Sequence, residues 1–272
     1  MLWGVSGPRF LLDYVTAVAV ALAVAVAVRE LTGRRVRGAA PDPVELAYLT
    51  DRAGLACQVG VAVLHGAGLV RRGELATLAV DGPPPARSGQ LVRALHAALR
   101  RPQTWAAVLA DPGVGRALRR LVGRLVRDGW LLTPAQRRWV ALGTVPLFAV
   151  AVVGLTRLVD SAVEGRAAGG PASVVGLLLC CLATALTGWW LSEVPETGAA
   201  ARRLLRRLRR RHADLDPQRR PVWSERGTDE LLTAMALFGP RPLLALDPRL
   251  GELVGIDAER TRPAPQRKLS RS

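Results

Sequence analysis

The apolar residues of this chain gather into three long runs, and nearly all of its charged residues lie outside them. The runs cover residues 10–28, 140–156 and 174–191, and Asp13 is the one charged residue inside them. An α-helix rises about 1.5 Å per residue, so runs of this length cover roughly the 30 Å hydrocarbon core of a bilayer. The pattern predicts a mainly α-helical membrane protein with three transmembrane helices.

Positive charge indicates the orientation of these helices. Of the 38 Lys and Arg residues, only Arg9, Arg157 and Arg166 would lie outside the cell if the N-terminus is outside. Basic residues are retained on the cytoplasmic side of bacterial plasma membranes. Arginines also follow the first run rather than precede it, which favours a signal anchor over a cleaved signal peptide. We therefore expect a multi-pass protein with its N-terminus outside and its C-terminus in the cytoplasm.

This orientation sets the expected order of segments. The parts outside the cell are residues 1–9 and the loop 157–173, and the cytoplasmic parts are a basic linker 29–40, a domain 41–138, a basic helix 199–215 and a tail 216–272. Tryptophans at the ends of membrane spans anchor them at the interface. The residues expected in this role are Trp3, Trp139, Trp189 and Trp190.

The region 41–138 has the pattern of a soluble domain. Asp42, Pro43 and Glu45 form a helix-start signal, with an N-cap, a proline in the first turn and a capping-box carboxylate. A second helix is expected over 52–65, ended by Gly66 and Gly68. The segment 69–80 then has the pattern of a β-hairpin.

Part of this pattern recurs 61 positions later in the chain. Each copy has an upstream helix, a longer helix, a glycine stop and an extended segment, and the matching positions are Val61, Leu64, Gly68, Leu69 and Val70 with Val122, Leu125, Gly129, Trp130 and Leu131. The fold class predicted for 41–138 is therefore a small α(+β) domain of two winged-helix-like units in tandem.

Two helices are unusually rich in arginine, and we take their basic faces as candidate contacts for anionic lipid or a partner. The candidates are Arg116, Arg119, Arg120, Arg124 and Arg127 in the second unit, and Arg202, Arg203, Arg206, Arg207, Arg209, Arg210 and Arg211 after the third span. Each arginine near an anionic leaflet would contribute on the order of 1 kcal/mol. The alternatives are a solvated face over a core stripe for the first helix, and retention of the span's orientation for the second.

The tail contains a moderately apolar segment, 228–256, that is broken by Pro240, Pro242 and Pro248. Prolines at this spacing are incompatible with a fourth span. We expect the segment to dock on the domain, and the last dozen residues to be disordered.

No combination of residues indicates catalysis or a bound cofactor. His65, His96 and His212 are scattered without ligand partners at metal-site spacing. Phosphate-binding loops and the nucleophile and zinc motifs of hydrolases are absent. Cys180 and Cys181 lie inside the third run, where thiols act mostly as small apolar groups, and a redox role is the alternative. Asp13 is either a functional intramembrane carboxylate or, from its terminal position, a group that reaches the interface.

Several short motifs resemble an uncharacterised family of actinobacterial multi-pass membrane proteins. They are the opening Trp3-Gly4-Val5-Ser6-Gly7-Pro8, the stretch Pro43-x-Glu45-Leu46-Ala47-Tyr48-Leu49, the Gly68-Leu69-Val70 unit, Leu131-Leu132-x-Pro134-Ala135, and Ala236-Leu237-Phe238-Gly239 with Ala245-Leu246-Asp247-Pro248. The resemblance implies spans around a cytoplasmic domain and carries no catalytic residues. The paired helical units are also similar to the bacterial relatives of Golgi phosphoprotein 3, which implies recognition of phosphorylated lipid head groups.

Taken together, these patterns favour a non-enzymatic membrane scaffold with no cofactor, whose cytoplasmic domain binds a protein partner. Recognition of anionic phospholipids through the arginine-rich helices is the second hypothesis, and a membrane-tethered transcription regulator is the third. Nucleic acid is the less favoured partner because the first unit offers few basic residues on its second helix. Transport is disfavoured by the near absence of polar groups inside the spans.

Overall fold

The computed structural model describes residues 7–32, 36, 38–73, 76–86, 88–163, 178–179, 182–184, 186–189, 197–219 and 221–256. The chain divides into two compact units. The apolar unit consists of residues 1–36 and 131–200, and the globular unit consists of residues 37–130 and 201–272. Each unit is thus built from two separate stretches of the sequence.

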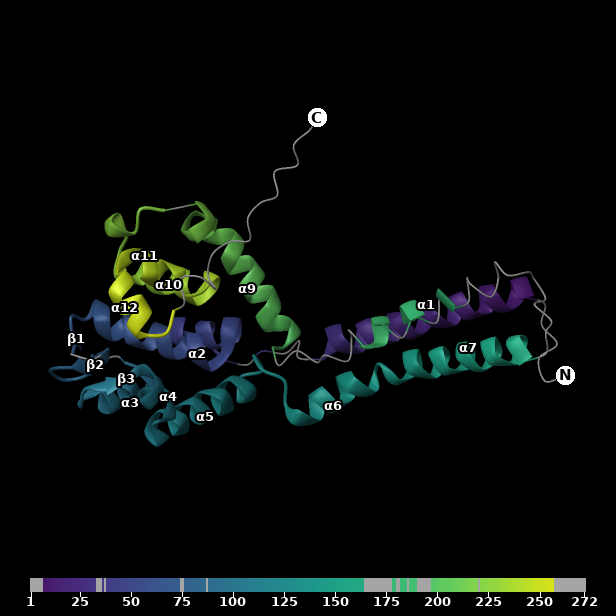
Figure 1. Cartoon of the computed structure of the whole chain (residues 1–272), viewed down its shortest axis with the longest axis horizontal. Helices are drawn as coiled ribbons and strands as arrows, with labels where there is room; N and C mark the ends of the chain where they lie inside the picture. Colours follow the sequence, from purple (N-terminus) through teal and green to yellow (C-terminus); the bar gives the residue numbers. More distant parts are fainter. Residues whose placement is uncertain are drawn as a thin grey trace, which may run out of the picture. The chain divides into compact units, whose positions relative to one another are not determined.

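The apolar unit is built on helices α1 (Gly7–Leu31), α6 (Pro134–Leu142) and α7 (Val145–Val163). Helix α1 runs alongside α7 and also contacts α6 (Figure 1). Their shared core is small and consists of Ala21, Ala25 and Leu147. Gly143 separates α6 from α7, and a Cβ atom added there would lie 3.4 Å from the Val28 side chain. The absence of a side chain at Gly143 therefore lets the joint between α6 and α7 approach α1.

Two helical segments of this unit are long and apolar enough to cross a membrane. They are Leu12–Leu31 and Pro134–Thr156, with mean hydropathies of 1.9 and 2.0. This confirms helices at the first two predicted spans. The third predicted span, 174–191, falls largely outside the described residues, and its described parts (178–179, 182–184 and 186–189) are helical.

The globular unit begins with α2 (Pro43–Gly66), which starts at the predicted capping box. Asp42 accepts a hydrogen bond from the Glu45 N–H at 2.7 Å, and Glu45 accepts one from the Asp42 N–H at 3.3 Å. The two helices expected here form one element with a kink at Asp51 and Arg52. The predicted stop is confirmed, since α2 ends at Gly66 and Gly68 has a φ of +70°.

A three-stranded antiparallel sheet follows, in the order β1 (Val70–Arg72), β2 (Thr77–Val80), β3 (Gln103–Thr104). The first two strands form the predicted hairpin, with Val70 opposite Val80. Strand β3 pairs with β2 through only two residues. Helices α3 (Gln90–Leu99), α4 (Trp105–Ala110) and α5 (Pro112–Arg127) complete this part of the unit.

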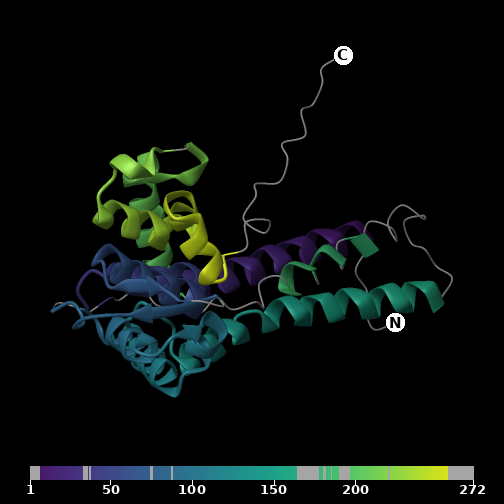
Figure 2. The ribbon, with the colours of Figure 1, turned by 60° about the vertical axis from the view of Figure 1, so that its left-hand side comes forward.

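The tail supplies the rest of the globular unit. Its elements are α9 (Ala199–Arg211), η1 (Ala213–Leu215), η2 (Pro217–Arg219), η3 (Trp223–Glu225), α10 (Thr228–Phe238), α11 (Arg241–Leu246) and α12 (Pro248–Leu253). Helix α10 packs along α2 in the most extensive contact between two described elements (Figure 2). The Thr50 hydroxyl donates to the Ala236 carbonyl at 2.7 Å, and the Gln58 amide donates to the Val254 carbonyl at 3.1 Å. The segment 228–256 therefore forms part of the folded core.

The two predicted repeats differ in how they end. In the first, Gly68 leads into the β1–β2 hairpin. In the second, Gly129 has a φ of +83° as expected for a helix stop, but Leu131 forms only an isolated bridge to Thr197. Helix α3 lies between the repeats and was not predicted. The helices and one hairpin agree with the sequence pattern, and the winged-helix fold itself stays a prediction.

Candidate functional site

The arginines of α5 lie on the face of the helix that points away from the core. Val114, Ala117, Leu121 and Leu125 are buried, and the N-cap Asp111 accepts hydrogen bonds from the backbone N–H groups of the first turn. The exposed arginines of this helix are Arg116, Arg119, Arg120 and Arg127. The predicted amphipathic arrangement is thus present, with a basic face over a core stripe.

Arg124 differs from the other arginines of α5 because it has a partner in the fold. Its Nη2 lies 3.3 Å from Oε1 of Glu45, whose side chain is 16% exposed. Burial and the nearby Asp42 carboxylate raise the pKa of Glu45, and the charge of Arg124 partly opposes this rise. Arg127 donates from Nε to the Gly123 carbonyl of its own helix at 3.3 Å. Arg124 therefore serves to join α5 to the start of α2.

The arginines of α9 also fall into two groups, those that bond to the rest of the fold and those that are exposed. Ala201 and Leu205 are buried, and Leu204 and Leu208 are partly buried beside them. Arg209 donates from Nε to the Leu237 carbonyl at 2.9 Å, which ties α9 to α10. Arg202 and Arg203 are partly buried and take part in interactions. The fully exposed arginines that carry no such bond to α10 are Arg206, Arg207, Arg210 and Arg211.

Helix α3 adds basic residues that the sequence patterns did not single out. Arg93, Arg100 and Arg101 are exposed at its surface or just after its last turn. The missed signal was the spacing of Leu91, Leu95 and Leu99, which recurs at helical intervals in a segment of only ten residues. These arginines lie in the globular unit, as do those of α5.

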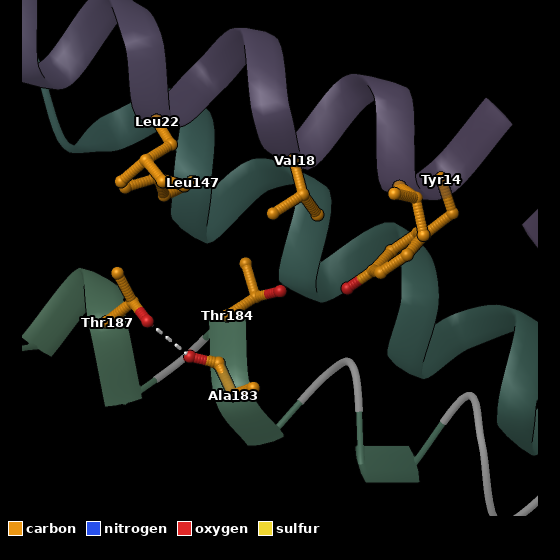
Figure 3. Close-up of a pocket in the computed structure, with 8 residues that line it drawn as sticks. Tyr14, Val18, Leu22, Leu147, Ala183, Thr184 and Thr187 are labelled. Atoms are coloured by element: carbon orange, nitrogen blue, oxygen red, sulfur yellow. Dashed lines mark hydrogen bonds between the residues drawn. The ribbon is translucent and has the colours of Figure 1, made fainter. Parts of the chain in front are cut away.

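The apolar unit contains a cavity of about 180 Å³ between α1, α7 and the residues Ala183, Thr184 and Thr187 (Figure 3). It is lined by Tyr14, Val15, Val18, Leu22, Leu147, Ala183, Thr184 and Thr187. The hydroxyl groups of Tyr14 and Thr184 point toward one another (Figure 3), and that of Thr187 donates to the Ala183 carbonyl at 2.7 Å. Among the described residues that line it, none is a carboxylate, histidine, cysteine or basic residue. This composition suits hydrocarbon rather than acid–base chemistry.

The remaining residues singled out from the sequence are distributed as follows. Asp13 is exposed on α1. Trp139 and Trp189 are 66% and 71% exposed, and their role as interfacial anchors stays a prediction. Trp3, Trp190, Cys180 and Cys181 lie outside the described residues.

The side chains of His65, His96 and Cys57 lie in structural contacts of the globular unit. His96 lies with Nε2 3.0 Å from the Gly82 carbonyl, and His65 lies 3.9 Å from the Asp247 carboxylate. Cys57 is fully buried, and this burial raises the pKa of its thiol to about 12. In the described part of the chain, no group of three or more His, Cys, Asp or Glu residues is arranged to hold a metal ion. The exposed arginines of α3, α5 and α9 therefore offer basic surfaces for binding.

Comparison with protein families, with curated proteins and with solved structures gives no match for this chain. Function must therefore be argued from the two units and their surfaces.

Proposed function

We propose that this chain is an integral protein of the bacterial plasma membrane that acts as a non-enzymatic scaffold. It crosses the membrane three times, with its N-terminus outside and its globular unit in the cytoplasm. The globular unit binds a protein partner, and the basic helix α9 rests on anionic head groups of the inner leaflet.

One observation carries the three-span topology. The globular unit is assembled from residues on both sides of the stretch 131–200, because α10 packs on α2. Both segments must share one aqueous compartment, so the chain must cross the membrane an even number of times between them. The segment Pro134–Thr156 supplies one crossing, and the apolar run 174–191 is the candidate for the return. With α1, the total is three, and the N-terminus lies on the side opposite the globular unit.

The exposure of apolar side chains in the apolar unit supports a lipid environment. Only 17% of the apolar window in Leu12–Leu31 and 28% of that in Pro134–Thr156 is buried. The core helix of a water-soluble protein would be mostly buried, because each exposed Å² of apolar surface costs about 25 cal/mol in water. Side chains such as Leu12, Val152 and Leu155 are more than half exposed, and contact with hydrocarbon would remove this apolar surface from water.

The position of α9 supports contact with the inner leaflet. It begins at Ala199, a few residues after the end of the run 174–191. Arg206, Arg207, Arg210 and Arg211 are therefore held near the membrane by the chain itself. Near an anionic leaflet such a cluster is attracted by about 1 kcal/mol per residue.

Paired reporters test the topology. A reporter that is active only in the cytoplasm is inserted in the exposed loop 82–86 or fused after residue 272. As the control, a periplasm-active reporter is placed between residues 164 and 173, since α7 continues to Val163 and the expected outer loop 157–173 is helical in its first part. We expect both cytoplasmic fusions and the loop control to be active. If the insertion at 82–86 and the fusion after residue 272 report opposite sides of the membrane, the number of crossings between them is not even. That result would refute the proposed scaffold topology.

Site-specific crosslinking in living cells tests the scaffold function. A photoreactive residue at exposed positions of the globular unit, such as Arg119 or Val222, should recover one protein reproducibly. The same residue at Val152, which faces lipid in this proposal, is the matched control and should recover lipid alone. If no position in the globular unit recovers a specific protein, the scaffold proposal fails even if the topology stands.

A further inference from the structure

The surface beside α3 and the start of α5 carries two hollows, which together we call the α3–α5 seam. The first, of about 490 Å³, is lined by Gln90, Arg93, Ala94, Gly113, Arg116, Ala117 and Arg120. The second, of about 520 Å³, is lined by Ala97, Ala98, Arg100, Arg101, Gln103 and Asp111. Small residues form much of this lining, which leaves the space between the longer arginine side chains.

The seam follows the whole of α3. The first hollow begins at Gln90, the first residue of the helix, and the second reaches Gln103, beyond its last turn. A helix of ten residues is about 15 Å long. An extended peptide rises about 3.3 Å per residue, so four or five residues would fill the seam, with alternate side chains facing it.

The arginines of the seam are exposed and unpaired among the described residues. They are Arg93, Arg100, Arg101, Arg116 and Arg120. In the described part of the chain, none of them forms an ion pair. Asp111 lines the second hollow, but its Oδ1 already accepts hydrogen bonds from the N–H groups of Gly113 and Val114. Five positive charges therefore line the two hollows beside α3 with little compensation from the described residues, which favours an anionic ligand.

The shape of the surface distinguishes between anionic ligands. The two hollows together follow the length of α3, which suits an elongated ligand better than a single lipid head group. Guanidinium groups pair with carboxylates through two parallel hydrogen bonds, a geometry that suits closely spaced Asp or Glu side chains. We propose that the α3–α5 seam is a docking groove for an acidic, extended segment of a partner protein. This inference rests on the scaffold function proposed above and names the surface and the chemistry of the partner.

The test uses the full chain in nanodiscs of phosphatidylcholine, which has no net charge. The probe is a fluorescent peptide of about eight residues rich in Glu, and its binding is followed by fluorescence anisotropy against the same peptide with Gln in place of Glu. The variant Arg93→Gln/Arg116→Gln/Arg120→Gln should weaken binding of the Glu peptide about tenfold or more. The matched control, Arg119→Gln/Arg127→Gln, changes exposed arginines of the same helix that do not line the seam and should change binding less than about twofold.

The outcomes separate the seam from general charge. Equal weakening by the seam variant and the control, or no preference for the Glu peptide over the Gln peptide, would overturn the proposal. Nanodiscs with phosphatidylglycerol or a single-stranded oligonucleotide serve as competitors, and preference of the seam arginines for either over the Glu peptide would also overturn it. Thermal unfolding of each variant verifies that the fold is retained. None of these results alters the reporter assay of topology, so a failure here is distinguishable from a failure of the membrane proposal.

Discussion

Arg124 in the last turn of α5 forms an ion pair with Glu45 in the first turn of α2, with 3.3 Å between Nη2 and Oε1. The other oxygen of this carboxylate accepts the Asp42 N–H of the capping box. One side chain thus completes a local helix start and joins two helices that are far apart in sequence. The structural role of Arg124 separates it from the exposed arginines of the same helix.

Glu45 gives a pH-dependent prediction. Burial, followed by the charge of Asp42, raises its pKa in the folded state. A folded pKa above the unfolded value means that the folded state binds the proton more tightly, so stability from this group falls as pH rises through the interval between the two values. The quantity to compare is the free energy of unfolding of the wild type minus that of Glu45→Gln. We expect this difference to increase on acidification from about pH 7 to pH 4.

Denaturant unfolding of both proteins across this pH range measures the effect. The variant Asp229→Asn, on the exposed side of α10, controls for general effects of removing a carboxylate. A wild-type advantage that shrinks on acidification would mean that the pairing with Arg124 outweighs the burial of Glu45.

The kink of α2 predicts a difference between two substitutions of Arg52. Arg52 has φ 59° and ψ −149°, a conformation that is essentially restricted to glycine and costs other residues about 1–3 kcal/mol. Arg52→Gly should have a free energy of unfolding about 1 kcal/mol higher than Arg52→Ala, after the added freedom of glycine in the unfolded chain is subtracted. Arg52→Ala is the control, because it removes the same side chain and keeps the strain. Equal stability of the two variants would contradict the prediction.

Asp247 makes two contacts, one that caps α12 within the tail and one that joins the tail to the first half of the globular unit. Its Oδ1 accepts the Leu250 N–H at 3.1 Å as the N-cap of α12, and its Oδ2 pairs with Arg72 on β1. Asp247→Asn keeps a capping oxygen and loses the charge, whereas Asp247→Ala loses both. We expect Asp247→Ala to be less stable than Asp247→Asn by about 1 kcal/mol, with faster amide exchange in α12 than in α3.

The exposed pair of Arg71 and Asp81 on the neighbouring strands provides the control for Asp247. Exposed ion pairs contribute little, so Asp81→Ala should cost no more than about 0.5 kcal/mol. If Asp81→Ala is as costly as Asp247→Ala, the cap and the burial of Asp247 do not explain its effect.

Cys57 should be unreactive while the globular unit is folded. Its side chain is fully buried, and its thiol pKa of about 12 leaves almost no thiolate near neutral pH. In a Cys180→Ser/Cys181→Ser background, we expect negligible labelling by maleimide in native protein and complete labelling in denaturant, measured by mass spectrometry. Rapid labelling of native protein would show that α2 is not packed as described.

Local signals in the sequence were sufficient for the starts and stops of several elements. The capping box at Asp42 and Glu45, the positive φ at Gly68 and Gly129, and the β1–β2 hairpin were all predicted, because each depends on a few neighbouring residues. The two helices that are long and apolar enough to cross a membrane were predicted for a similar reason, since length and lack of charge are properties of a single segment. Strand β3 was missed because a two-residue strand has no detectable period.

The contacts between distant segments were decided only by the tertiary structure. Composition does not reveal that α10 lies along α2, that Arg124 meets Glu45, or that Arg209 bonds to the Leu237 carbonyl. Every arginine on an amphipathic helix has the same local pattern, and whether it is exposed, paired or beside a hollow depends on which helix packs against its own. The folded chain therefore separates the arginines that hold the unit together, such as Arg124 and Arg209, from those exposed at its surface.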